Sequence, residues 1–459
     1  MSNLPTGWQE IPLNEISEIV MGQSPPSSSY NSEGRGLPFF QGKAEFQALY
    51  PRVVKFCDEP KKIAETGDIL LSVRAPVGPT NLNKEKSCIG RGLAAIRPSQ
   101  VTSSQYLLNY LRFIEPILSK QGTGSTFTAI SKKDVEGIAV LLAPLDEQQR
   151  IVAKLDQLLA KVDACKERLD KIPAILKRFR QSVLAAACSG RLTADWRQAD
   201  TKRADVERSS NNGNPFPVPV SWSWGFLADY IESMSNGIYK PEEFYNDTGV
   251  ICLRMYNIQD GKVDWTKLKR MNLHENEIEK YSLKENDILI NRVNSRELVG
   301  KAALMPHLTE PVIFESKNIR MRLKRERITA AYVNYLFMTK LVRDIFEESA
   351  KQTVGMATIS QPQIRRILVP LPPIDEQHEI VRRVEALFKL ADDIEKRYEK
   401  ARAHVDRLTQ SILAKAFRGE LVPQDPGDEP ASELLKRIRQ EKASKEEKGG
   451  VRSRRTRQD

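Results

Sequence analysis

The sequence predicts a mixed α+β fold with an internal pseudo-twofold repeat, in which two α/β globular domains are separated by two long antiparallel coiled-coil helices. Two observations lead to this prediction. One segment of about 47 residues occurs twice, and both copies carry a heptad pattern of apolar residues. Before each copy, short β-like runs alternate with glycine, proline, asparagine and serine, which is typical of small sheets joined by turns.

The duplicated segments run from Asp146 to Leu192 and from Asp375 to Leu421. They align without a gap at an offset of 229 residues and share about 18 identities. Similarity further upstream is weaker, and its offset drifts between about 213 and 219 residues. In this region Trp8 is matched with Trp224, and Gly22 with Gly237. The order along the chain is therefore globule, helix, globule, helix.

Each duplicated segment is expected to form a long helix, because its apolar residues recur at alternating steps of four and three. The seam predicted for the first helix contains Ile151, Leu155, Leu158, Val162, Leu169, Ile172, Leu176 and Phe179. The seam predicted for the second contains Ile380, Val384, Leu387, Ile394, Tyr398, Val405, Leu408 and Ile412. Asp146 and Asp375 are expected N-caps, and Gly190 and Gly419 suit C-terminal stops.

The chain carries its own matching partner helix, which favours pairing within one chain over the alternative of a generic coiled-coil homodimer. Antiparallel pairing would relate the two halves by a pseudo-twofold axis. Pro173 lacks a backbone N–H, so the first helix is expected to kink or break there. Its counterpart Arg402 should continue the second helix without interruption.

Within the globules, β-like runs are predicted at residues 52–56, 68–73 and 93–96, and again at 250–255, 287–290 and 318–323. Single helices are predicted near residues 104–119 and 330–348. A strongly twisted sheet with few helices is the expected result in each globule.

The composition favours a polyanionic partner. The formal charge is +11 and the isoelectric point is about 9.2, and cations placed near phosphates release counterions on binding. No long apolar run predicts a membrane span, and the N-terminus does not resemble a secretory signal, so a cytoplasmic protein is expected. The five cysteines include no Cys-x-x-Cys pair and are interpreted as small apolar residues.

Several loops combine glycine, amide and cationic residues, which are the groups that contact base edges and phosphates. Each such loop alone is more often simply solvated, but similar loops recur in both globules. The strongest case is Arg74 and Arg292, each just after an Asp-Ile-Leu strand. The candidate DNA contacts are Gln41, Lys43, Arg74, Arg91, Thr123 and Ser125 in the first globule, and Arg254, Tyr256, Asn257, Arg292, Asn294, Arg296 and Lys317 in the second.

Searches for catalytic patterns find little. The stretch from Gly36 to Ala44 has one residue too many between its glycines for a phosphate-binding loop, and Ala44 replaces the required Ser or Thr. No Asn/Asp-Pro-Pro-aromatic motif of an amino-methylating site is present, and the four histidines lack metal-ligand spacing. No metal or catalytic residue is therefore predicted.

The alternation of two globules with two helices that nearly repeat one another resembles the specificity subunits of type I restriction–modification systems. The most specific stretches are Pro144–Gln148, Ile172–Gln181, Pro373–Gln377 and Gln410–Leu421, and they are similar to the enterobacterial type of that family. The resemblance implies a first target recognition domain at residues 1–145 and a second at 216–374. It also implies a central helical spacer at 146–195, a linker at 196–215 and a C-terminal helical spacer at 375–421. Residues 422–459 lie beyond the resemblance, and their composition predicts a basic, partly disordered tail.

The resemblance further implies a non-catalytic subunit that reads a bipartite, asymmetric site in double-stranded DNA, with the spacer length set by the helix pair. Two methylation subunits and, in the full complex, restriction subunits would be its partners, with no membrane involved. Adenine-N6 methylation and ATP-dependent cleavage would lie in those subunits, so S-adenosylmethionine, ATP and magnesium are expected there and no cofactor in this chain. The alternative is a coiled-coil adaptor whose globular domains bind proteins rather than DNA.

Overall fold

The computed structural model describes residues 4–121, 129–199, 214–353, 355–437 and 439–440. They belong to two compact units. The first unit joins Met1–Asp170 with Lys400–Asp459, and the second comprises Lys171–Glu399. Each unit contains a globular domain and a pair of helical segments, so the predicted mixed fold with its internal repeat is confirmed.

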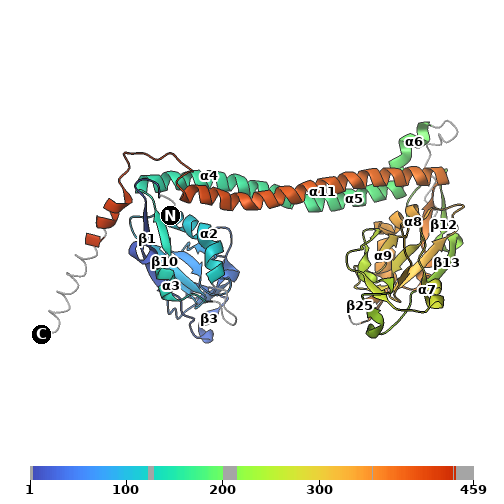
Figure 1. Ribbon diagram of the computed structural model, residues 1–459, viewed down its shortest axis with the longest axis horizontal. Coiled ribbons are helices and arrows are strands. Elements are labelled where there is room, and N and C mark those ends of the chain that lie inside the picture. Colours follow the sequence, from blue (N-terminus) through green and yellow to red (C-terminus); the bar gives the residue numbers. More distant parts are fainter. Residues whose placement is uncertain (1–3, 122–128, 200–213, 354, 438, 441–459) are drawn as a thin grey trace. The chain divides into compact units, whose positions relative to one another are not determined.

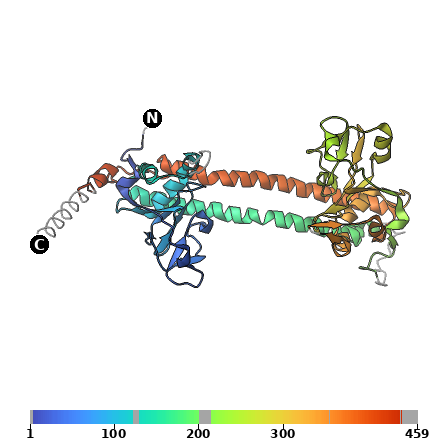
Figure 2. The same cartoon turned by 90° about the horizontal axis from the view of Figure 1, so that it is seen from below.

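The helical segments are α4 (Leu145–Asp170), α5 (Ile172–Cys188) and the 44-residue α11 (Ile374–Phe417). In the first unit, α4 and the C-terminal part of α11 run side by side (Figures 1 and 2). Lys166 Nζ donates to Thr409 Oγ1 over 3.3 Å, whereas Asp170, four residues later, pairs with the earlier residue Arg402. The segments are therefore antiparallel.

The same direction is found in the second unit, between α5 and the N-terminal part of α11. Arg180 Nη2 donates to Asp392 and Glu395, at 2.7 Å in each case. Further along α5, Val183 shares an apolar core with Ile380. Residue numbers again rise along one helix as they fall along the other.

The helix ends follow the expectations in part. The break at Pro173 is confirmed, because α4 ends at Asp170 and α5 begins at Ile172, whereas α11 passes Arg402 uninterrupted. Gly190 and Gly419 follow the C-terminal ends with φ of 72° and 74°, in the left-handed region that glycine adopts readily. The expected N-caps are wrong: Asp146 and Asp375 lie in the first helical turn, where their charge favours the helix dipole.

The predicted seam residues differ in burial. Those that are buried are Ile151, Leu155, Val162, Leu176, Ile380 and Val384. Those that are half-buried are Leu158, Leu169, Ile172, Phe179, Leu387, Tyr398, Val405, Leu408 and Ile412. Ile394 is 38% exposed. The deepest burial lies near the helix ends, where Ile151 and Leu155 join the core of the first domain and Ile380 and Val384 join that of the second.

The first domain contains α1 (Leu13–Ile16), α2 (Ser104–Gln121) and α3 (Lys132–Glu136). Its strands are β1 (Gln9–Pro12), β2 (Ser17–Met21), β3 (Tyr30–Asn31), β4 (Leu37–Phe40), β5 (Lys55–Cys57), β6 (Ile63–Ala64), β7 (Ile69–Ser72), β8 (Thr80–Leu82), β9 (Ser87–Ile89), β10 (Leu93–Pro98) and β11 (Ala139–Leu142). They form a β1-β11 pair and the sheets β2-β10-β7-β8 and β3-β5-β4-β9-β6. Helix α2 packs against β8 and β10, and its Tyr106, Leu107 and Leu111 are buried in the core of the first domain.

The second domain contains α7 (Glu275–Tyr281), α8 (Ala330–Phe337), α9 (Lys340–Ser349) and α10 (Gln361–Arg365), and α6 (Ala194–Ala199) follows α5. Its strands are β12 (Ser223–Phe226), β13 (Ile231–Asn236), β14 (Tyr245–Asn246), β15 (Val250–Leu253), β16 (Ile258–Gln259), β17 (Lys262–Val263), β18 (Lys269–Met271), β19 (Ile288–Asn291), β20 (Val293–Asn294), β21 (Ala302–Leu304), β22 (Val312–Phe314), β23 (Asn318–Leu323), β24 (Lys351–Thr353), β25 (Met356–Thr358) and β26 (Leu368–Leu371). The single helix expected over 330–348 is two helices, because Thr339 ends α8 and its hydroxyl caps α9.

The two domains share one strand plan. The pair β12-β26 repeats β1-β11, and the sheet β13-β23-β19-β21 repeats β2-β10-β7-β8. The order β14-β18-β15-β22 repeats β3-β5-β4-β9, including a parallel pairing of the last two strands. Two further small sheets, β16-β17 and β20-β25-β24, belong to the second domain.

A β-bulge accounts for part of the drifting offset between the domains. Ile231 pairs with Leu323 and Ser233 with Arg322, so Glu232 is an extra residue in β13. Before the bulge, matching residues of the two domains are 214 positions apart. Trp8 Nε1 donates to Glu147 and Trp222 Nε1 donates to Glu376, each at 2.9 Å, so the two tryptophans occupy the same place in their domains. The counterpart of Trp8 is thus Trp222, and the match with Trp224 was wrong.

The Asp-Glu-Gln sequence that opens each long helix attaches the helix to its domain. The buried Gln148 amide donates to the carbonyls of Val101 and Ala143, and Gln377 makes the equivalent bonds to Arg327 and Pro372. With the two Trp–Glu bonds, these contacts satisfy buried polar groups that would otherwise be costly. The first helical turn is therefore fixed to the domain that precedes it.

Part of the segment after α11 also packs on the first domain. Asp428 makes a two-pronged ion pair with Arg150 of α4 at 2.5 and 3.1 Å. Residues 431–437 are helical, and Ala431, Leu434 and Leu435 are buried in the core of the first domain. Residues 441–459 lie outside the described residues.

Candidate nucleic-acid interface

Four loops meet at one edge of the first domain. They follow β2, β4, β7 and β9, and we call residues 22–24, 41–43, 73–74 and 90–92 the first loop cluster. The N–H groups of Gly90, Val73 and Gly22 donate to the carbonyls of Phe40, Gly92 and Leu93 over 2.8 to 3.0 Å. The backbone thus holds the four loops together, independently of their side chains.

The second domain builds the same edge from the loops after β13, β15, β19 and β22. Residues 237–239, 254–257, 291–294 and 315–317 form the second loop cluster. The N–H of Glu315 donates to Leu253, and the N–H of Arg292 donates to Lys317, in the places of the Gly90 and Val73 bonds of the first domain. The two clusters therefore share a backbone frame while their side chains differ.

Glycine is needed where these loops approach most closely. A Cβ on Gly22 would lie 2.2 Å from the carbonyl oxygen of Gly90, and one on Gly237 would lie 2.2 Å from that of Glu315. No other residue fits without moving the neighbouring loop. The sequence match of Gly22 with Gly237 thus reflects the same close backbone contact.

The predicted DNA contacts are distributed unevenly over these surfaces. Gln41, Lys43, Arg74, Arg91, Tyr256 and Arg296 are exposed, whereas Arg254, Arg292, Asn294 and Lys317 are half-buried. Thr123 and Ser125 lie outside the described residues. All the exposed and half-buried residues except Arg296 belong to the two loop clusters, and their contacts with DNA stay predictions.

One of the predicted contacts needs correction. Asn257 is fully buried, and its amide group donates to the carbonyls of Asp264 and Lys267 while its Oδ1 accepts from the Arg254 N–H. It shapes the loop and cannot reach a base. Arg296 is two residues beyond the second loop cluster, and its guanidinium donates to the Glu347 carbonyl of α9 over 3.4 Å; its contact with DNA stays a prediction.

Arg74 and Arg292, which the sequence placed alike, are not equivalent. The N–H of Val73 donates to Gly92 just as that of Arg292 donates to Lys317, and the carbonyls of both accept from the next segment, at Ile130 and Ile359. Arg292 therefore corresponds to Val73 and lies one position before the counterpart of Arg74. Successive side chains on an extended strand point to opposite faces, so the two arginines point differently.

Beside the second loop cluster lies a polar pocket of about 370 Å³. Arg254 lies in it with its guanidinium carbon 5.1 Å from the ring centre of Tyr245 and 5.3 Å from that of Tyr256. Burial raises the pKa of Tyr245 to about 12, so its phenol keeps its proton at neutral pH. The remaining lining includes Tyr239, Lys240, Lys269, Glu315 and Lys317.

Sequence reasoning did not select Tyr239, Lys240, Tyr245 or Lys269, and it placed Glu315 in a candidate loop at residues 315–318 without choosing it as a contact. Tyr239 and Lys240 follow Gly237 by two and three residues, Lys269 begins β18 and Glu315 follows β22, but the two domains are too dissimilar to align by sequence. The register of the paired strands identifies such positions. For example, Glu315 follows β22 in the second domain as Gly90 follows β9 in the first.

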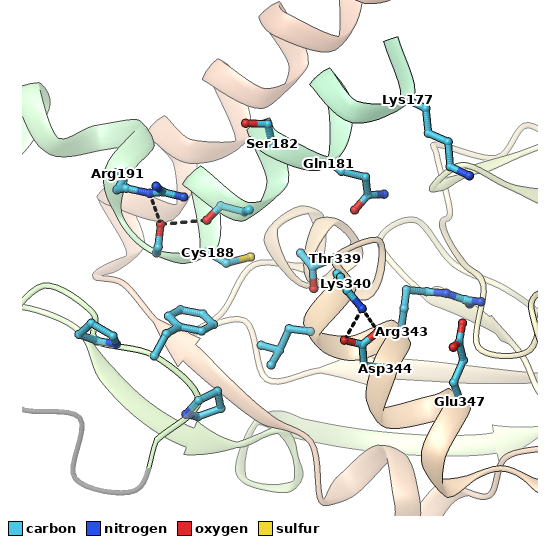
Figure 3. A pocket seen from close by; sticks show the side chains of 16 residues that line it. Lys177, Gln181, Ser182, Cys188, Arg191, Thr339, Lys340, Arg343, Asp344 and Glu347 are labelled. Atoms are coloured by element: carbon cyan, nitrogen blue, oxygen red, sulfur yellow. Dashed lines mark hydrogen bonds and ion pairs between the residues drawn. The ribbon is translucent and has the colours of Figure 1, made fainter. Parts of the chain in front are cut away.

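A larger cleft of about 1030 Å³ lies in the second unit between α5 and α9 (Figure 3). Its charged groups are largely paired: Lys340 Nζ lies 2.6 Å from Asp344 Oδ1, and Arg343 donates to the Val299 carbonyl over 2.7 Å. Burial raises the pKa of the Cys188 thiol in its wall to about 12, which makes it a poor nucleophile. Among the described residues that line the cleft, no Ser, Thr or Cys side chain is hydrogen-bonded to a His, Lys, Asp or Glu side chain.

Two searches restricted to the described part of the chain are negative. It contains no group of three or more His, Cys, Asp or Glu side chains able to hold a metal ion. It also contains no helix long and apolar enough to cross a membrane.

Comparisons with known proteins agree over most of the chain. The family model described as type I restriction modification DNA specificity domain matches residues 5–174 and 219–402. The EcoKI type I restriction enzyme specificity subunit from Escherichia coli K12 is 31% identical, covering 96% of this chain and 97% of that protein. The StySPI specificity subunit from Salmonella potsdam is also 31% identical, covering 96% of each chain.

Solved structures with a similar fold include two from such systems. A chain from a structure on complex assembly and conformational transition of the type I R-M system aligns with a TM-score of 0.69 and 19% identity, covering 92% of this chain and all of that one. The HsdS subunit from Thermoanaerobacter tengcongensis aligns with a TM-score of 0.55 and 18% identity, covering 91% and 98%. These likenesses concern the fold.

Proposed function

Because this chain belongs to the type I restriction modification DNA specificity family, we propose that it is the subunit that reads the target sequence of such a system. It recognises a bipartite site in double-stranded DNA, with one half-site bound by each domain. It carries no catalytic centre of its own; the relatives share its full length and are named specificity subunits.

The observation that carries this proposal is the pair of loop clusters. One backbone frame appears twice, but Gln41, Arg91 and Gly92 of the first cluster are replaced by Arg254, Ser316 and Lys317 in the second. Base edges are read by side-chain donors and acceptors, so unlike side chains on like frames read unlike sequences. The site is therefore asymmetric even though the chain is an internal repeat.

The spacer between the half-sites is set by the helix pair. The 44 residues of α11 correspond to a helix about 66 Å long at about 1.5 Å per residue. The first helical turn on each side is fixed to its domain by the Trp–Glu and Gln contacts. A rod attached in this way favours one spacer length over others.

The partners follow from the family. Two methylation subunits bind this chain and carry S-adenosylmethionine, and they methylate adenines that have been flipped out of the duplex. Restriction subunits, which use ATP and magnesium, complete the complex. The chain works in the cytoplasm, where its DNA target lies. A protein-binding adaptor, the alternative weighed from the sequence, is not favoured by the family match.

Mapping methylated adenines across the host genome tests this function. We expect a split motif with a fixed gap and two different halves in cells that have this gene, and loss of every occurrence when the gene alone is deleted. Restoring the gene from a plasmid is the control and should restore the motif. If the methylation pattern is the same with and without the gene, the proposal is contradicted, and the protein-binding adaptor becomes the favoured function.

A further inference from the structure

We propose that Arg254 reads a guanine in the half-site of the second domain and that Gln41, at the matching place in the first domain, reads an adenine in the other half-site. The proposal rests on the function above and adds to it which residues contact bases and which bases they select. The proposal depends on three observations: the Nη groups of Arg254 have no partner among the described residues, its Nε and backbone are held by neighbouring groups, and the strand register matches Arg254 with Gln41.

The guanidinium of Arg254 is held at one end and free at the other. Its Nε donates to Glu315 Oε2 over 3.1 Å, while the described residues offer no hydrogen-bond partner to its Nη groups. The Arg254 side chain is 33% exposed, and that of Glu315 is 6% exposed. The two Nη groups of one guanidinium provide parallel N–H donors, which match O6 and N7 of guanine in the major groove.

The turn that carries Arg254 is fixed by the same carboxylate. Glu315 Oε1 accepts from the Met255 N–H over 2.8 Å, and Asn257 Oδ1 accepts from the Arg254 N–H over 2.9 Å. Glu315 thus bonds to both the side chain and the backbone of one turn. It is a positioning residue, because it acts through Arg254 and is itself buried.

Aromatic rings restrict the remaining freedom of the guanidinium. Tyr245 and Tyr256 lie on it at 5.1 and 5.3 Å, distances at which the ring face attracts a cation. A rigid, preoriented arginine loses little entropy on binding, which suits selective contact with a base better than loose attraction to a phosphate.

The matching residue in the first domain is Gln41. Strands β4 and β9 are parallel, as are β15 and β22, and the residue after each first strand is Gln41 or Arg254. The carbonyl just before each accepts the N–H of Gly90 or Glu315. Gln41 is exposed, and a glutamine amide pairs with N6 and N7 of adenine.

Arg254→Gln and Gln41→Arg in the complex with the methylation subunits test the inference. A bidentate side chain discriminates between bases by about 5- to 150-fold. We expect R254Q to change the preferred base at one position of one half-site from guanine to adenine, and Q41R to make the reverse change in the other half-site. The measurement is the methylation rate on duplex libraries in which each position of the motif is randomised.

Two further variants separate the possible outcomes. Glu315→Gln should lower the discrimination at the same guanine without moving the preference to another base, whereas Arg270→Gln, which breaks an exposed pair with Glu310, should change nothing. Equal loss of rate on all sequences with R254Q would mean a phosphate contact and would overturn the inference. An unchanged motif would also overturn it while the proposed function stands, and the absence of any motif for the wild-type chain would instead refute the function.

Discussion

Lengthening both helices by seven residues is expected to lengthen the gap of the recognised site while both half-sites keep their sequence. Suitable positions lie in the first unit, after Glu167 in α4 and after Val405 in α11, because both fall between the Lys166–Thr409 and Asp170–Arg402 contacts. One heptad preserves the apolar seam and adds about 10 Å. That length corresponds to about three base pairs.

The original site should lose methylation by more than about 100-fold, since a domain displaced by about 10 Å cannot reach its half-site. The new site should be methylated more slowly than the wild-type site, because three added base pairs also rotate the duplex by roughly 100°. Methylation of duplexes with gaps of every length gives the measurement. Seven residues inserted after Asp247, in an exposed turn, are the control and should leave the gap unchanged. If the variant with both insertions folds correctly and still recognises sites with the wild-type gap length, the helix pair does not set the spacer length.

Glu376→Ala should destabilise the second unit by about 3–5 kcal/mol, the usual cost of removing one partner of a buried charge pair. The Glu376 side chain is 1% exposed. It accepts hydrogen bonds from Thr193 Oγ1 at 2.7 Å, from Trp222 Nε1 at 2.9 Å and from the guanidinium of Arg197. Removing it leaves the Thr193 hydroxyl and Trp222 Nε1 without this acceptor and takes the opposite charge away from Arg197, which keeps its bonds to Thr193 Oγ1 and to the Gly190 carbonyl.

Glu147→Ala is the matched control in the first unit, because Glu147 has one donor, Trp8 Nε1, and should cost only about 1–3 kcal/mol. Hydrogen exchange read by mass spectrometry measures the two units separately. Peptides from residues 172–199 and 374–399 should lose protection in the Glu376 variant. Equal losses in the two variants would mean that Arg197 and Thr193 contribute nothing to this contact.

The features that depend on local periodicity could be predicted from the sequence. The heptad spacing of Ile151 to Phe179 predicts a helix, and the missing N–H of Pro173 predicts its interruption. The duplication added the partner helix and, with it, the antiparallel pairing. Strand positions such as β7 and β19 followed from short apolar runs bounded by turn residues.

The features that depend on register between distant strands could not be predicted. The bulge at Glu232 has no signature in a single dissimilar pair of domains. The one-position shift between Arg74 and Arg292 could have been read from the sequence, because Arg74 is six residues after its Asp-Ile-Leu aspartate and Arg292 is five residues after its own. Asn257 resembles a DNA-contacting amide in sequence, yet its group is consumed by two backbone carbonyls. Glu315 was placed in a candidate loop but not chosen as a member of the site, because a carboxylate in such a loop acquires a role only beside Arg254.

The most direct test of two independent readers on one ruler is an exchange of the first domain. Residues 13–143 would be replaced by the corresponding stretch of the EcoKI relative. This exchange leaves in place Trp8 and Glu147 of this chain, and also the bond between the Ala431 N–H and the Gly7 carbonyl. Mapping of methylated adenines should show one half-site replaced, with the other half-site and the gap unchanged. A change in both half-sites, or in neither, would contradict the assignment of one half-site to each domain.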